Sequence, residues 1–491
     1  MTASVTTDAH HSIRNSFNPH TRILAIGAVT VALYTANNGV MQALFHGGGQ
    51  GYGIRNLLLQ MALYLFVTGC IFVAYRQVLS MCSRGELVGR ARLCAVAIPC
   101  VLSVLLVVWT PSLSEDVFSY MAHGFLGVIP GSNPLLRPAD AAAHTAIGPS
   151  LAAFGWHGEI GITPYGIVWT QIEVTIMKLS GIDVPTALIL LKSVVAAASL
   201  ATAFFIWVFL GAVRPSCQLF GTLAYLWNPL ILAEFAGEGH NDAVMVLFVV
   251  AGLAACATRR PTASMIAQLL GFLTKYVSIL FFPAQLIYLW RLRRSAGQLA
   301  LDVLIALVTT AAIAAILYAP LWAGVHSFDG LLQRGQPMSS ASPFGAVNWV
   351  LRRSPLAAHA GPLTLALVTL PLLGFIAWIS LRVKDAVGLA RAFAWISVVY
   401  ALLTSPDYWP WYVCMPVALL IMADVGELLW LIMLLSITAR LCAPLDLIRD
   451  HGFLSMVVAK ATLTGVCTTV PFVVLVVWMY RKRGRLPAIF A

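Results

Sequence analysis

The apolar run from Leu93 to Trp109, LCAVAIPCVLSVLLVVW, is followed at once by the polar stretch Thr110-Pro111-Ser112-Leu113-Ser114-Glu115-Asp116-Val117-Phe118-Ser119-Tyr120. The run has the length and composition of a membrane-spanning helix. Glu115 and Asp116 therefore stand at the mouth of that helix, where two adjacent carboxylates are costly unless they are solvated or used. This stretch indicates the fold class, and it is also the first place to look for chemistry.

The composition of the whole chain is that of a membrane protein. Of the 491 residues, 60% are hydrophobic and only 10% are charged, so a water-soluble core cannot account for the chain. The net charge of +11 does not indicate a nucleic-acid partner, because Lys and Arg occur mainly in short clusters between apolar runs. The nine Cys are scattered without a CxxC pair and are interpreted as small core residues.

Apolar runs recur along the chain and predict an all-α polytopic membrane protein with about 12–14 transmembrane helices. The runs lie near residues 23–44, 57–75, 93–109, 184–210, 217–233, 242–257, 262–274, 276–290, 299–318, 362–380, 391–403, 411–423, 428–441 and 454–480. A single transmembrane domain over residues 23–480 is expected, between a polar tail of residues 1–22 and a basic tail of residues 481–491. The first run is interpreted as an uncleaved helix rather than a signal peptide.

Positive charge predicts the orientation of these helices. If the N-terminus is cytoplasmic, nearly every inside segment is basic, as such segments usually are. The basic residues concerned are Arg14, Arg22, Arg76, Arg84, Arg90, Arg92, Arg214, Arg259, Arg260, Arg291, Arg293, Arg294, Arg382, Lys384, Arg391, Arg481, Lys482, Arg483 and Arg485. Both termini are thus expected in the cytoplasm, while the other polar residues gather at the extracytoplasmic face. There, residues 110–183 are interpreted as a large loop with interfacial helices, because a full span would invert the topology.

Three interpretations of Glu115 and Asp116 are open from the residues alone. Either carboxylate could act as a general base toward an acceptor hydroxyl, or as a metal ligand that steadies a phosphate. Asp116 could instead cap the helix that begins with Val117. The residues favour a functional role, since a cap does not require two carboxylates beside an apolar surface.

A second polar cluster lies between two predicted spans and contains Glu234, Glu238, His240, Asn241 and Asp242. Such groups bind sugar hydroxyls and also cations. The alternative is an ordinary hairpin in which the last two residues cap the next helix. The spacing alone leaves the role of the imidazole undecided between a base and a hydrogen-bond donor.

Three further charged residues are expected near the same face. Lys275 interrupts an apolar segment and either extends to the interface or faces a cavity, where it would bind a lipid phosphate or stabilise it as a leaving group. Arg334 allows the same two interpretations. Asp407 lies in an aromatic loop, which is either an interfacial belt or a surface for a sugar ring.

These residues together resemble the polyprenol-phosphate-mannose-dependent α-1,6-mannosyltransferases, membrane glycosyltransferases of the GT-C superfamily. The similarity runs from about residue 20 to residue 480 and is carried by the order of several short motifs. They are Glu115-Asp116-x-x-Ser119-Tyr120, Gly131-Ser132-Asn133-Pro134, Pro164-Tyr165-Gly166, His240-Asn241-Asp242, Lys275-Tyr276 and Pro410-Trp411-Tyr412.

The resemblance implies a GT-C multi-helix bundle in the cell (inner) membrane, with an extracytoplasmic active site and a donor sugar on a polyprenyl phosphate. The essential acidic residue of the first large outside loop maps onto Asp116, with Glu115 beside it. The remaining candidates for substrate contact are Tyr120, Asn133, Glu238, His240, Asn241, Asp242, Lys275, Arg334 and Asp407. No cofactor is certain, and a divalent cation stays an open alternative with no assigned ligands.

The resulting hypothesis is an inverting transfer of a hexose, with mannose expected. Asp116 would take the proton of an acceptor hydroxyl while Lys275 or Arg334 balances the charge of the departing phosphate. The partners expected are the lipid-phosphate donor, a lipid-linked or glycan acceptor, and membrane lipids. The alternative is a multi-span transporter or a flippase for lipid-linked glycans, which would place ionisable groups at mid-membrane in two matching halves.

Overall fold

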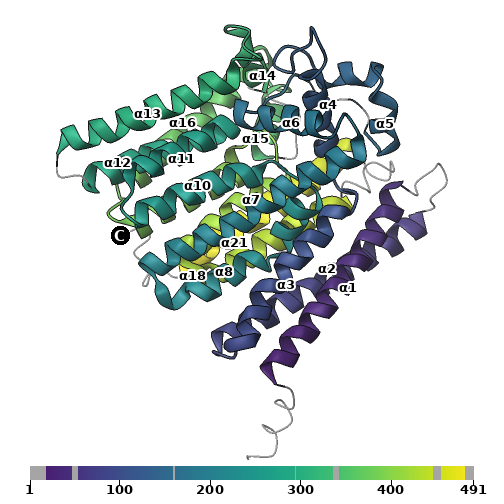
Figure 1. Ribbon diagram of the computed structural model, residues 1–491, viewed down its shortest axis with the longest axis vertical. Coiled ribbons are helices and arrows are strands. Elements are labelled where there is room, and N and C mark those ends of the chain that lie inside the picture. Colours follow the sequence, from purple (N-terminus) through teal and green to yellow (C-terminus); the bar gives the residue numbers. More distant parts are fainter. Residues whose placement is uncertain are drawn as a thin grey trace, which may run out of the picture.

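The computed structural model describes residues 18–46, 54–156, 158, 161–292, 295–334, 342–445 and 455–481. In these ranges every regular element is a helix and no named strand occurs, which confirms the predicted all-α class. Figure 1 shows the long helices as one bundle, with α4, α5, α6 and α14 gathered at one of its ends. The predicted tail of residues 481–491 falls almost wholly outside the described residues, as does most of the tail of residues 1–22.

The long apolar runs form membrane-spanning helices. By length and composition, nine segments of the described chain could cross a membrane, and a bent pair, Pro215–Leu226 with Pro229–Gly237, could supply a tenth span. The helices in these ten segments are α1 (Pro19–His46), α2 (Ile54–Ser83), α3 (Gly89–Val108), α7 (Val184–Val213), η3 (Pro215–Cys217), α8 (Gln218–Leu226), α9 (Pro229–Ile231), η4 (Leu232–Gly237), α13 (Ala296–Tyr318), η7 (Ala357–His359), α16 (Ala360–Ser380), α17 (Ala386–Val399), η8 (Tyr400–Thr404), η9 (Pro410–Val413), α18 (Cys414–Arg440), α20 (Met456–Thr464), η10 (Gly465–Thr469) and α21 (Val470–Arg481). The shorter helices of the bundle are α10 (Asp242–Ala257), α11 (Pro261–Thr274), η5 (Tyr276–Phe281) and α12 (Phe282–Leu292).

The helix α18 turns back on itself. Asp424 interrupts it with non-helical backbone angles, and the residues on either side form two halves. The ring of Trp411, just before the first half, stacks on His240, while Arg440 at the end of the second half pairs with Glu234. A straight helix of this length would span about 40 Å and could not bring both ends to one place. The two apolar runs predicted at 411–423 and 428–441 therefore correspond to the two halves.

Short helices fill the long segment between α3 and α7, as predicted. They are α4 (Asp116–Leu126), η2 (Ala139–His144), α5 (Gly148–Ala153) and α6 (Ile167–Leu179). The helices α4 and α6 pack closely, and Gly124 makes this approach possible, since a Cβ there would lie 2.5 Å from the backbone oxygen of Glu173. After α13, the chain adds η6 (His326–Phe328), α14 (Asp329–Arg334) and α15 (Pro343–Leu351).

The basic segments meet at the other end of the bundle. Arg22 pairs with Glu86 at 2.7 Å, which joins the start of α1 to the turn between α2 and α3. Asp424 contacts Arg214 at 3.3 Å and Arg391 at 3.7 Å. The middle of α18 thus lies with the ends of α7 and α17 that carry positive charge, away from the loop helices.

The helices differ in how deeply they are buried. Each membrane-spanning segment has one most apolar stretch of 18 residues. The buried share of that stretch is 67% in Ala386–Thr404 and 61% in Pro410–Leu445, but only 17% in Ala296–Tyr318. Many large apolar side chains on the outer helices are exposed, among them Leu59, Phe66, Val308, Ile316, Leu367 and Leu370. Such surfaces suit lipid rather than water, so α17 and α18 form the core of the bundle and α13 its outside.

Candidate active site

A buried lysine fixes the end of the helix that leads to Asp116. Lys192 lies inside α7, is completely buried, and donates from Nζ to the carbonyl oxygens of Leu106, at 2.8 Å, and Trp109. Carbonyls at the end of a helix lack partners within the helix, and a cation there also interacts favourably with the helix dipole. The chain that leaves α3 therefore starts from a fixed point.

A buried carboxylate then holds the next three residues. Glu238 Oε2 accepts hydrogen bonds from the backbone N–H groups of Ser112 at 3.2 Å, Leu113 at 2.9 Å and Ser114 at 3.2 Å. Gly239 follows with φ of +81°, a conformation that favours glycine. Glu238 was predicted to hold substrate hydroxyls, and in the structure its carboxylate organises the approach to α4.

Asp116 is the first residue of α4, and its carboxylate faces the interior of the site. Its backbone N–H donates to Ser114 Oγ at 3.1 Å, and its Oδ2 accepts from the hydroxyl of Tyr120 at 3.4 Å. The Tyr120 ring is itself packed edge-on against Tyr165 and Trp169. The Asp116 side chain keeps 22% of its surface exposed, so this carboxylate is both positioned and accessible.

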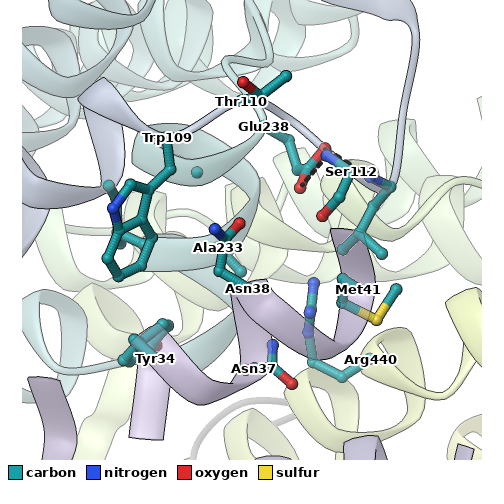
Figure 2. A pocket seen from close by; sticks show the side chains of 13 residues that line it. Tyr34, Asn37, Asn38, Met41, Trp109, Thr110, Ser112, Ala233, Glu238 and Arg440 are labelled. Atoms are coloured by element: carbon teal, nitrogen blue, oxygen red, sulfur yellow. Dashed lines mark hydrogen bonds between the residues drawn. The ribbon is translucent and has the colours of Figure 1, made fainter. Parts of the chain in front are cut away.

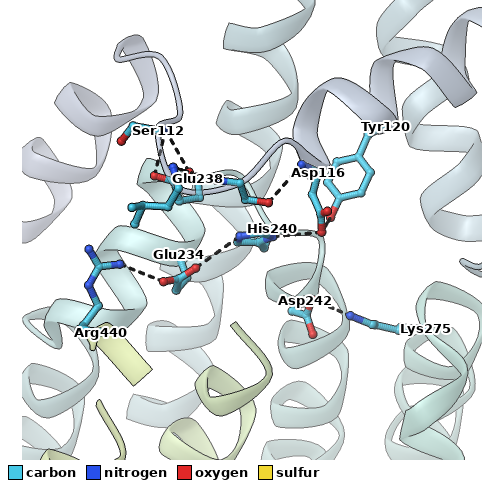
Figure 3. Close-up of polar contacts among 11 residues, drawn as sticks. Ser112, Asp116, Tyr120, Glu234, Glu238, His240, Asp242, Lys275 and Arg440 are labelled. Carbon is cyan, nitrogen blue, oxygen red and sulfur yellow. Dashed lines mark hydrogen bonds and ion pairs between the residues drawn. The ribbon is translucent and has the colours of Figure 1, made fainter. Parts of the chain in front are cut away.

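His240 lies between two carboxylates, as Figure 3 shows. Its Nδ1 is 3.6 Å from Asp116 Oδ2, and its Nε2 is 3.3 Å from Glu234 Oε2. The other oxygen of Glu234 pairs with Arg440 Nη1 at 2.9 Å. Burial alone would lower the pKa of His240, but the two carboxylates raise it to about 9. The two carboxylates therefore favour the charged form of the imidazole.

Aromatic rings from the loop and short helix before α18 cover His240. The ring of Trp411 stacks on the imidazole with 3.7 Å between centroids, and Trp409 stacks on Trp411 at 5.1 Å. The aromatic loop predicted to form either a belt or a sugar surface thus supplies one wall of the site. Asp407, in the same loop, is half-buried, and its contact with substrate stays a prediction.

Asp242 and Lys275 form a second charged group beside the first. Lys275 Nζ donates to Asp242 Oδ2 at 2.7 Å, and the ammonium lies 4.7 Å from the ring centre of Tyr412 and 5.9 Å from that of Tyr165. Asp242 is buried, while the Lys275 side chain keeps 13% of its surface exposed. Lys275 therefore lies beside aromatic rings with part of its side chain exposed, and its contact with a lipid phosphate stays a prediction.

The buried amide of Asn241 stands beside this pair. Both of its side-chain polar atoms are without a hydrogen-bond partner among the described residues. Leaving a buried polar group unpaired costs about 1–3 kcal/mol, so a ligand or water is the natural partner. Its role in binding hydroxyls stays a prediction.

The remaining predicted residues are Glu115, Asn133 and Arg334. The Glu115 side chain is exposed, unlike that of its neighbour. Asn133 donates from Nδ2 to the carbonyl oxygen of Leu321 at 2.7 Å and accepts from the N–H of Leu135 at 2.9 Å, so its amide ties two loops together. Arg334 ends α14, and its side chain lies outside the described part of the structure.

A pocket opens next to Glu238, on the side that faces α1. Figure 2 shows Asn37 and Asn38 of α1 together with Trp109 and Arg440 around it. Its full lining is Tyr34, Asn37, Asn38, Met41, Leu106, Trp109, Thr110, Ser112, Leu113, Ala233, Gly237, Glu238 and Arg440. Arg440 and Glu238 line this pocket, and Arg440 also pairs with Glu234.

The carboxylates are mostly committed to partners within the protein. Glu234 pairs with Arg440, Asp242 with Lys275, and Glu238 with backbone N–H groups. In the ranges described, no group of three or more His, Cys, Asp or Glu side chains could hold a metal ion. The arrangement offers the accessible Asp116 carboxylate and the partly exposed Lys275 ammonium, which suits proton transfer beside an anionic group.

Sequence reasoning missed several of the residues that build this site. Lys192 and Arg440 were not among the candidates, and Glu234 was noted only as part of its cluster. The signal existed, because a single basic residue inside an apolar run, or at its end, is rare unless it has a function or a partner. The partners themselves could not be predicted, since more than 200 residues of chain separate Glu234 from Arg440.

A comparison of the sequence with known protein families gives a match. Residues 20–291, more than half of the chain, match the family model described as alpha-(1->6)-mannopyranosyltransferase, N-terminal domain. The chain belongs to this family. It is therefore a glycosyltransferase of a mannose-transferring family, which confirms the resemblance inferred from the motifs. No curated protein gave a significant match.

The matched region of this mannosyltransferase-family protein does not contain the whole site. It includes Asp116, His240 and Lys275. Trp411 covers the imidazole of His240, and Arg440 pairs with Glu234 beside it. Both residues come from the last third of the chain. The second part of the chain thus contributes directly to the candidate active site.

Proposed function

We propose that this protein transfers mannose from a polyprenyl-phosphate donor to a hydroxyl of a lipid-linked or glycan acceptor, at the extracytoplasmic membrane face. The main support is the position of Asp116. Its carboxylate contacts Tyr120 and His240, remains accessible, and belongs to the loop helix α4 that follows the membrane helix α3. The Lys275 ammonium lies 5.9 Å from the ring centre of Tyr165, which packs against Tyr120. Family membership supports mannose as the sugar.

The proposed step is a single displacement at the anomeric carbon. The acceptor oxygen forms a bond to that carbon while its proton passes to Asp116. The bond between the anomeric carbon and the phosphate oxygen breaks, and its electron pair leaves with the polyprenyl phosphate. One displacement inverts the configuration of the anomeric carbon.

Lys275 is the candidate partner of the phosphate. One N–H of its ammonium already donates to Asp242, and the group can offer its other hydrogens to phosphate oxygens. The growing negative charge of the leaving group would be stabilised most where water is largely excluded. Arg334 stays a second candidate. A divalent cation with no assigned ligands stays an open alternative.

A lipid-linked donor suits the location of the site. The helices α4 and α6 lie among the ends of the membrane helices (Figure 1), where a prenyl chain could remain in lipid while its phosphate reaches Lys275. The positive-inside tendency supports the proposed side, since the basic residues Arg22, Arg214 and Arg391 gather at the opposite end of the bundle. On this basis both termini are cytoplasmic.

The test is transfer of labelled mannose by the purified protein in detergent. Polyprenyl-phosphate mannose is compared with nucleotide-linked mannose, each with and without a short mannose-containing lipid acceptor. We expect a glycosidic product from the polyprenyl donor only, and only with acceptor. Product from the nucleotide donor alone would overturn the donor assignment, and the absence of any product with mannose, glucose, galactose and arabinose donors would favour a transporter or flippase.

A further inference from the structure

Four charged side chains form a row that ends at Asp116. Arg440 contacts Glu234 at 2.9 Å, Glu234 contacts His240 at 3.3 Å, and His240 contacts Asp116 at 3.6 Å. Each residue comes from a different part of the fold, namely α18, η4, the η4–α10 turn and α4. Figure 3 shows the side chains in this order, and we call them the His240 relay.

Only one member of the His240 relay can reach a substrate. The side chains of His240, Glu234 and Arg440 are 0%, 2% and 5% exposed, whereas that of Asp116 is 22% exposed. Trp411 also covers one face of the imidazole. The three buried members can therefore influence the reaction only through Asp116.

The charges around the imidazole balance only when it is protonated. The charged groups in its surroundings, from α4, η4, the η4–α10 turn, α7, α10 and α18, are Asp116, Glu234, Glu238, Lys192, Asp242 and Arg440. Asp242 is already neutralised by Lys275. The remaining three carboxylates face two cations, so a charged His240 makes the group neutral as a whole. An uncompensated buried charge would be strongly destabilising.

An anionic donor makes this balance important for the reaction. A lipid phosphate near Lys275 would bring negative charge close to Asp116, and like charges favour the protonated form of a carboxyl group. A protonated Asp116 could not accept the acceptor proton. A cation fixed beside the carboxylate, 3.6 Å from Oδ2, opposes this effect.

We propose that Arg440, Glu234 and His240 are positioning residues that keep Asp116 ionised and oriented while the donor phosphate is bound. This inference rests on the proposed function, in which Asp116 accepts the proton. It assigns a role in the reaction to Arg440, which lies outside the part of the chain that matches the family model.

The test is the pH dependence of kcat/KM for the purified full-length protein, with His240→Gln beside wild type. Glutamine keeps hydrogen-bonding capacity but cannot carry the charge. We expect the acid limb of the profile to move upward by about one pH unit or more, since an opposite charge at this distance shifts a carboxyl by about 1–3 units. At neutral pH, kcat should fall at least about tenfold and recover partly at higher pH, with the donor KM nearly unchanged.

Two further comparisons separate positioning from simple loss of structure. Arg440→Lys keeps the charge and should retain the wild-type acid limb, whereas Arg440→Gln should shift it in the same direction as His240→Gln. Arg214→Gln removes a partner of Asp424 at the other end of the bundle and should change thermal stability without moving the limb.

The outcomes distinguish the two proposals. If wild type transfers mannose but the acid limb is the same in His240→Gln and Arg440→Gln, the positioning role is wrong and the proposed function stands. The same conclusion follows if both variants lose activity equally at every pH. If wild type forms no product, the proposed function itself fails.

Discussion

The His240 relay and the Asp242–Lys275 pair lie beside each other but differ in how firmly they are held. Glu234, His240 and Arg440 are almost completely buried, and Trp411 covers the ring. The pair is a single contact of 2.7 Å, and the lysine keeps 13% of its side chain exposed. Burial on all sides leaves these three side chains no freedom to take a new partner, whereas Lys275 can exchange or share its partner. The first group is thus suited to positioning and the second to binding.

The largest effect should come from the accessible end of the relay. Asp116→Asn removes the proton acceptor and should lower kcat by about 100- to 10,000-fold. Glu115→Gln alters the exposed neighbour and should change kcat by no more than about threefold, as surface substitutions usually do. Steady-state transfer of labelled mannose measures both. Equal losses in the two variants would mean that the two carboxylates share the role.

Removing the lysine should have the next largest effect. Lys275→Met deletes a charged hydrogen-bond donor to the phosphate and should raise the donor KM by about 10- to 100-fold. Because the change leaves Asp242 buried without its partner, the double variant Lys275→Met with Asp242→Asn controls for loss of structure. Both should show the same donor KM, and an unchanged KM in the double variant would remove Lys275 from the donor site.

The pH dependence of stability should distinguish the relay from the rest of the bundle. The pKa of His240 is raised from 6.5 to about 9 in the folded protein. A raised pKa adds stability that is fully present below about pH 6.5 and is lost as the pH rises through about 9. The Tm in detergent should therefore fall by about 2–4 °C more in wild type than in His240→Gln between pH 7 and 9.5. Parallel curves for the two proteins would contradict a charged imidazole.

The smallest effect is expected at Asn133, outside both groups. Asn133→Ala removes the hydrogen bond to the carbonyl of Leu321 and should lower stability by about 1 kcal/mol. Its kcat and both KM values should stay within about twofold of wild type. A tenfold rise in either KM would show instead that the amide contacts substrate.

Much of the fold follows from apolar runs and positive charge. The reversal within α18 is one example. Asp424 and Glu427 stand between two short apolar runs, and the chain turns back at Asp424. Hydropathy reports the length of a helix and the charge of its ends, and both are local properties. The class of the protein and the segment of loop helices were predictable for this reason.

The site was predictable in its composition but not in its contacts. His240 and Asp242 stand two residues apart, yet one joins Asp116 and the other joins Lys275. Which side chain meets which depends on packing between distant helices, and no spacing rule reports it. The same holds for Glu238, whose sequence context resembles a ligand-binding residue and whose carboxylate instead holds backbone N–H groups.

We assign positioning to the His240 relay and donor binding to the Asp242–Lys275 pair. The most direct test of these two roles is donor binding at equilibrium. Binding of labelled polyprenyl-phosphate mannose, without acceptor, would be compared for wild type, Asp116→Asn and the Lys275→Met, Asp242→Asn double variant. We predict wild-type affinity for Asp116→Asn and affinity weaker by about tenfold or more for the double variant. Wild-type affinity in the double variant, or equal weakening in both, would contradict the account.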